Sequence, residues 1–234
     1  MFSTNESSYS QLMQGRVFCS SVAFFAKCHL KTVANLGRLS PQESRLIWIM
    51  MLHLFKNGDF FLKNWEKCFP HIVAFLQKDG HIKDKAVKAL LDNAFKEACD
   101  ENGEYASSLL AIHGYLVPSA KLCSKNVSGK TTHIKYTIKD SQESFLYCAK
   151  TQQEIEKHIM DLKSRKSAIQ PFILCFGDEM SKISNIYVYF DDIRFKFFHI
   201  LKAVDVCFKI IYIFNLDFPQ ESKMFCNFLE KCFL

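Results

Sequence analysis

The chain has 234 residues, of which just under half are apolar and 23 are phenylalanine. This composition is that of a globular protein and excludes a disordered chain. Thirty basic and 24 acidic side chains give a formal charge of +6, which permits contact with nucleic acid or acidic partners without requiring it. The chain contains only eight glycines and five prolines, so the many rings favour long helices packed through aromatic contacts.

The N-terminus and the cysteines indicate a cytoplasmic or nuclear protein. The first eight residues, MFSTNESS, have neither the basic nor the apolar region of a secretory signal. Most of the ten cysteines lie inside apolar runs, where a thiol serves as a small buried hydrophobe in a reducing compartment. The apolar runs 46–55 and 204–216 are shorter than the roughly 20 residues that cross a bilayer. We therefore expect no membrane contact.

The N-terminal half has the pattern of a helical domain over residues 15–117, preceded by a flexible polar arm over residues 1–14. Its clearest local signal is SPQE at 40–43, a capping box with proline at the first helical position. The predicted helices are 16–36, 40–57, 60–77 (bent or broken near Pro70), 82–98 and 105–115.

Composition changes at Pro118. Residues 118–139 include five lysines, one histidine and no acidic residue. They predict a basic connecting segment, partly extended through Ile134, Tyr136 and Ile138. Lysines along such a segment can follow a phosphate backbone, and the alternative is an ordinary solvated linker. The candidate nucleic-acid-binding residues are Lys121, Lys125, Lys130, Lys135, Lys139, Arg165 and Lys166.

The C-terminal part, residues 140–234, has the pattern of a small α+β module. Its predicted elements are a helix over 151–166, strands over 169–176, 186–190 and 194–197, and helices over 200–215 and from near Pro219 to the end. Asp191 and Asp192 are the predicted turn of a hairpin. The whole chain is therefore predicted to be a mostly helical α+β protein.

Three motifs that suggest chemistry fail on spacing. Ser128-Gly129-Lys130-Thr131 resembles the end of a phosphate loop, but position 124 is serine where that loop needs glycine. Asp191-Asp192 looks like the metal-binding hairpin of reverse transcriptases, but the preceding predicted strand carries no acidic residue. No two cysteines lie two to four residues apart, and the histidines are dispersed. We predict no catalytic residue, metal site, cofactor or small-molecule substrate.

Five stretches of the C-terminal part resemble a family of uncharacterised animal proteins that are multiplied in genomes as if carried by mobile elements. The stretches are IQPF at 169–172, NIYV at 185–188, LKAVDVCFK at 201–209, FNLDFPQES at 214–222 and FLEKCF at 228–233. The resemblance covers about 100 residues, from near Lys135 to the end, and departs from the family at Cys226 and Asn227. It implies a shared module of no established activity, with ordinary turn residues at positions 191 and 192.

These observations favour a non-enzymatic interaction protein that binds a protein partner or itself, because surplus aromatic surface is commonly used in association. Nucleic-acid binding through the basic segment 121–139 is the alternative. A degenerate polymerase-like enzyme is a further alternative.

Overall fold

The computed structural model describes residues 60–78, 80, 82–95, 99–125, 131–165 and 169–233, with the backbone alone for 60, 122–125, 131, 132 and 134. The predicted arm over 1–14 and the predicted helices over 16–36 and 40–57 lie outside the described residues. Lys130 and Lys166 also lie outside them. Among the described helices, none combines the length and the apolar character needed to cross a membrane.

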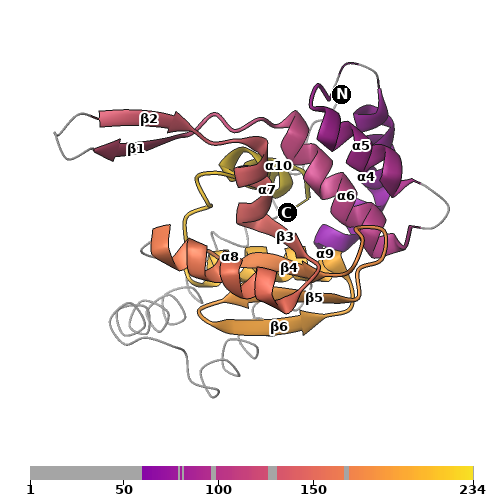
Figure 1. Cartoon of the computed structure of the whole chain (residues 1–234). Coiled ribbons are helices and arrows are strands. Elements are labelled where there is room, and N and C mark those ends of the chain that lie inside the picture. Colours follow the sequence, from indigo (N-terminus) through magenta and orange to yellow (C-terminus); the bar gives the residue numbers. More distant parts are fainter. Residues whose placement is uncertain are drawn as a thin grey trace, which may run out of the picture.

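The described part of the N-terminal half contains helices α4 (Phe60–Gln77), α5 (Lys85–Ala94) and α6 (Glu101–Tyr115), as predicted (Figure 1). Helix α4 runs through Pro70, so the chain is not broken there, and the predicted bend at this proline stays a prediction. The helices α5 and α6 begin after aspartates that act as N-caps. Asp84 accepts hydrogen bonds from two backbone N–H groups of α5, and Asp100 accepts one from Gly103 at 2.7 Å.

The basic segment forms an antiparallel two-stranded ribbon of β1 (Lys121–Lys125) and β2 (Thr131–Lys135), which extends away from the rest of the molecule in Figure 1. We call it the basic ribbon. Ile138, predicted to be extended, is instead the first residue of helix α7 (Ile138–Phe145). The reason is a capping box: Thr137 Oγ1 accepts from the Asp140 N–H at 3.0 Å, and the Thr137 N–H donates to the Asp140 carboxylate at 2.8 Å.

The C-terminal part contains a four-stranded sheet in the order β3 (Leu146–Ala149), β4 (Phe172–Phe176), β5 (Asn185–Phe190), β6 (Ile193–Phe197). The strands β3 and β4 are parallel, and helix α8 (Gln152–Arg165) makes the crossover that a parallel pair requires. The other pairs are antiparallel. Three of these strands were predicted, and β3 was not. It follows α7 directly, without the glycine or proline that usually bounds a strand.

The sheet is covered on both faces, which explains the unbroken apolar run of β4. Phe172 and Leu174 pack in a small cluster with the apolar side of α8. Ile173 and Cys175, the alternate residues of the same strand, belong to the larger core shared with α9 (Ile200–Ile213). The described structure therefore has the mostly helical α+β fold that the sequence predicts.

The larger core continues across the boundary predicted at Pro118. It includes Trp65 of α4 and Leu109 of α6 together with Phe225 and Phe233 of the last helix, α10 (Lys223–Phe233). The Trp65 and Phe233 ring centroids lie 5.2 Å apart. The described helices of the N-terminal half and the sheet thus share one hydrophobic core. Helix α10 begins four residues after the predicted start near Pro219.

Candidate functional site

The lysines of the basic ribbon lie on one of its faces. In the register of the two strands, Lys121 is opposite Lys135, position 123 is opposite His133 and position 125 is opposite position 131. Opposed residues share a face, and so does every second residue along a strand. Lys121, Lys125, His133 and Lys135 therefore occupy positions on the same face.

The opposed pair Lys121 and Lys135 carries an electrostatic cost. Both residues are exposed. Among the described residues, neither of the two lysines takes part in an ion pair. Like charges placed directly opposite each other destabilise an antiparallel pair. An anion bound between the two ammonium groups would remove that repulsion.

The two other predicted site residues that the structure describes, Lys139 and Arg165, lie off this face. Lys139 lies in the first turn of α7 and forms an ion pair with Glu143 at 3.6 Å. Arg165 ends α8, where its Nε donates to the Asp161 carbonyl at 3.2 Å. Arg165 also lines a hollow of about 130 Å³ with Tyr136, the residue after β2. The charged residues that line this hollow besides Arg165 are acidic: Asp140, Glu143 and Glu221.

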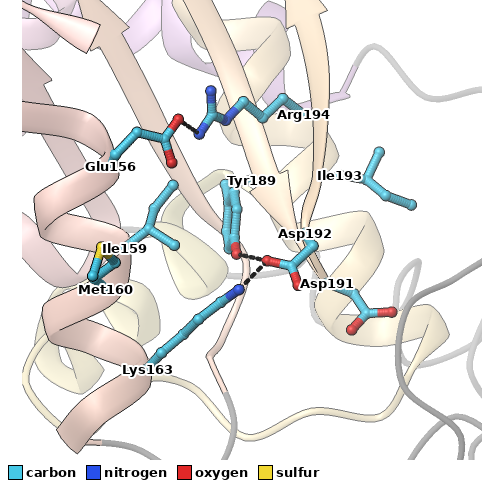
Figure 2. A pocket seen from close by; sticks show the side chains of 9 residues that line it. All are labelled: Glu156, Ile159, Met160, Lys163, Tyr189, Asp191, Asp192, Ile193 and Arg194. Carbon is cyan, nitrogen blue, oxygen red and sulfur yellow. Dashed lines mark hydrogen bonds and ion pairs between the residues drawn. The ribbon is translucent and has the colours of Figure 1, made fainter. Parts of the chain in front are cut away.

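A second charged region lies where α8 faces the hairpin of β5 and β6 (Figure 2), around a hollow of about 510 Å³. The Asp192 carboxylate accepts a hydrogen bond from the Tyr189 hydroxyl at 2.5 Å and forms an ion pair with Lys163. Arg194 forms an ion pair with Glu156 at 2.7 Å. The two ion pairs join α8 to the turn and to β6.

The turn itself has the backbone that the sequence predicts. Asp191 and Asp192 have φ angles of 50° and 65°, the left-handed conformation required at both central residues of a tight hairpin turn. Aspartate is tolerated there because its short side chain bonds locally. Burial of the Tyr189 side chain is the main cause that raises its pKa, and the hydrogen bond to Asp192 is the second. The hydroxyl therefore stays protonated and acts as a hydrogen-bond donor.

A polymerase-like site would need Asp191, Asp192 and a third acidic residue around a cation. Within the described ranges, no three or more His, Cys, Asp or Glu residues come together in a way that could hold a metal ion. The Asp192 carboxylate is already engaged by the ammonium group of Lys163. The observed contacts are those of a turn fastened to a helix.

One buried histidine had no counterpart in the sequence analysis. His113 of α6 stacks on Phe225 with ring centroids 3.7 Å apart, and its Nδ1 lies 2.7 Å from the Ser141 hydroxyl. Burial lowers the pKa of His113 from 6.5 to about 3. The ring is therefore neutral near pH 7 and serves as part of the core. No periodicity in the sequence distinguishes this residue from an exposed histidine.

Comparison with protein-family models, with curated proteins and with solved structures found no match for this chain. The resemblance seen over residues 135–234 stays a prediction. Function must therefore be inferred from the geometry of the residues described above.

Proposed function

We propose that this protein binds duplex nucleic acid through the lysine-bearing face of the basic ribbon. The observation that carries the proposal is the placement of Lys121 directly opposite Lys135, in a segment of 22 residues without an acidic side chain. Phosphate groups of a nucleic-acid backbone supply the negative charge that this face requires.

The position of the basic ribbon supports this proposal. The two strands extend from the body of the molecule, so the lysine-bearing face can approach a large ligand (Figure 1). A two-stranded hairpin by itself is only marginally stable in water, because it has too little apolar surface to bury. A bound partner would order it further, since anything that binds the folded form stabilises it.

The two-stranded form of the basic ribbon favours B-form duplex DNA. The major groove of B-DNA is about 12 Å wide and admits a two-stranded ribbon. The major groove of an A-form RNA duplex is deep and too narrow for side chains to read. We expect the protein to bind a DNA duplex more tightly than an RNA duplex of the same sequence.

The test is a titration of a labelled 20-base-pair DNA duplex by fluorescence anisotropy over a series of salt concentrations. The double variant Lys121→Gln, Lys135→Gln should bind more weakly and lower the slope of log K against log salt by about 2, since each phosphate contact contributes about 0.9. The matched control is Lys63→Gln, Lys67→Gln, which removes the same charge from exposed positions of α4. Equal slopes for the two variants, or no binding at low salt, would refute the proposal.

Association with a protein partner, or with a second copy of the chain, is the second candidate function. It is favoured by an exposed apolar surface near the start of the basic ribbon. Phe75 and Tyr115 are 41% and 43% exposed and contact each other edge to face, with ring centroids 5.0 Å apart. Val117, two residues further along the chain, is 58% exposed.

Sedimentation distinguishes this second function from nucleic-acid binding. The purified chain should associate as its concentration rises, and Phe75→Ser with Val117→Ser should reduce the association without changing the salt slope of DNA binding. A strict monomer at high concentration, together with no partner recovered in a pull-down, would count against it. No reaction is proposed, and the absence of an enzymatic activity stays a prediction.

A further inference from the structure

Three sulfur atoms from separate parts of the chain lie together at the β3 edge of the sheet. Cys148 of β3 and Cys175 of β4 are register partners on neighbouring parallel strands, and both belong to the larger core on the same face of the sheet. Met180 comes from the loop between β4 and β5, and its Sδ lies 3.6 Å from the Cys148 Sγ. We call these three residues the sulfur cluster.

The loop that carries Met180 is held firmly in place. The Asp100 N–H donates to the Ser181 carbonyl at 3.0 Å, and the Lys182 N–H donates to the Glu179 carbonyl at 3.1 Å. Gly103 of α6 lies so close to the loop that a Cβ there would be 2.6 Å from the Met180 carbonyl oxygen. These contacts place the Met180 backbone, and the thioether reaches Cys148 from it.

Two members of the sulfur cluster border a hollow. Cys148 and Met180 line a largely apolar hollow of about 370 Å³ between α5, α7 and β3. Cys175 is 1% exposed and lies behind them in the core. The thiols of Cys207 and Cys226 are also neighbours, but both are fully buried and neither lines this hollow. That second pair fits the predicted role of cysteines as interior filling.

We propose that Cys148, Cys175 and Met180 form a three-coordinate binding site for a soft monovalent metal ion, namely Cu(I). Thiolate and thioether ligands select this ion, whereas carboxylates and water favour hard cations. At a metal–sulfur distance of about 2.3 Å, the sulfurs of a planar three-coordinate site stand about 4 Å apart. The 3.6 Å between the Cys148 and Met180 sulfurs needs only a small adjustment to reach that separation.

Zinc is a poorer match for the same residues. Structural zinc takes four ligands, almost always from cysteine, histidine or carboxylate side chains. Among the residues that the structure places, these types form no group of three or more that could hold a metal ion. Two thiolates and a thioether instead satisfy an ion that accepts three soft ligands.

Binding at this site exchanges protons for the metal ion. One Cu(I) enters, the two thiol protons leave to solvent, and no electron is transferred, so the loaded site carries one net negative charge. The affinity should therefore increase with pH by up to about two proton equivalents per ion.

The test uses the full chain, reduced and metal-free, with Cu(I) supplied anaerobically as its coloured bicinchoninate complex. The protein should remove one ion per chain and develop a near-ultraviolet thiolate-to-metal absorption. Cys148→Ser and Met180→Leu should each weaken binding by about 10–100-fold, at least the loss that accompanies removal of an outer-shell partner. Methionine to leucine keeps the side-chain volume, so the second variant is expected to fold even if the first does not.

The matched control is Cys232→Ser, at an exposed thiol of α10. Its affinity for Cu(I) should equal that of the unaltered chain. Binding lost in Cys232→Ser but retained in Cys148→Ser and Met180→Leu would overturn the proposal. Equal affinity in the unaltered chain and all three variants would mean that thiols elsewhere hold Cu(I). That result would also refute the proposal.

Discussion

The basic ribbon and the four-stranded sheet are both made of short strands, yet they differ in what surrounds them. The sheet has α8 on one face and α9 on the other, and alternate residues of β4 and β5 enter two hydrophobic clusters. The basic ribbon pairs only with itself in the described structure and places like charges opposite each other. Burial of apolar side chains explains why the strands of the sheet form, but it does not explain the strands of the basic ribbon.

The two regions therefore depend on different kinds of partner. The sheet finds its partners within the chain, so changes there should appear as lost stability. Lys121 and Lys135 form no ion pair in the described structure, so changes there should appear as lost binding. Four measurements of the free energy of unfolding in urea test this contrast.

The largest effect is expected at Trp65. Its ring is completely buried and contacts the rings of Phe61, Phe69, Tyr105 and Phe233, which join α4 to α6 and α10. Trp65→Ala should lower the free energy of unfolding by about 3–5 kcal/mol because it leaves a large cavity. Trp65→Phe is the control and should lose far less, since the indole N–H has no hydrogen-bond partner among the described residues.

The next largest effect is the pH dependence of the free energy of unfolding that comes from His113. Its pKa is about 3 in the folded state because the ring is buried, against an ordinary value of 6.5 in the unfolded chain. The unfolded state therefore binds the proton first, and stability falls as the pH drops from about 6.5 towards 3. The slope from this residue is about 1.4 kcal/mol per pH unit.

His113→Phe should remove this part of the slope, measured as the free energy of unfolding at several pH values between 4 and 7. His133→Gln, at an exposed position of the basic ribbon, should leave the slope as it is. Parallel pH profiles for the unaltered chain and His113→Phe would show that the buried ring is not what makes the protein sensitive to acid.

A smaller loss is expected where α5 and α6 touch. A Cβ at Gly114 would lie 2.5 Å from Cγ1 of the buried Val87 side chain. Gly114→Ala should cost about 1–3 kcal/mol, as overpacking of a core does. Adding Val87→Ala should recover part of that loss, because the two residues are in direct contact. If the losses in free energy of unfolding for Gly114→Ala and Val87→Ala simply add, the cost of Gly114→Ala does not come from its contact with Val87.

The smallest effect on stability is expected in the basic ribbon. Lys121→Gln with Lys135→Gln should change the free energy of unfolding by less than about 0.5 kcal/mol, with the sign of stabilisation because a like-charge pair is removed. The same variant is expected to bind DNA more weakly, with the lower salt slope given above. A loss of stability comparable to that of Gly114→Ala would show that the lysines belong to the fold.

Much of the described fold follows from local patterns. Apolar spacing predicted the helices α4, α5, α6, α8, α9 and α10, and the alternation around Asp191 and Asp192 predicted the hairpin. The strand β3 was missed because four residues carry too little pattern. Its conformation comes from pairing with β4, which lies 26 residues further along the chain.

The candidate sites divide in the same way. The basic character of 118–139 is visible in the sequence, but the facing of Lys121 and Lys135 depends on a register that composition does not reveal. The sulfur cluster was not visible at all, since Cys148 and Cys175 lie 27 residues apart. A search for closely spaced ligands finds only sites built from one loop or one helix.

The mostly helical α+β class, the hairpin turn and the basic segment follow from the sequence, because each depends on residues close together in the chain. The shared core of α4, α6 and α10, the pairing of Asp192 with Lys163 and the contact of Met180 with Cys148 are visible only in the folded molecule. These contacts join segments distant in sequence. They form only when packing and strand pairing bring the segments together, and local propensity does not predict such long-range contacts.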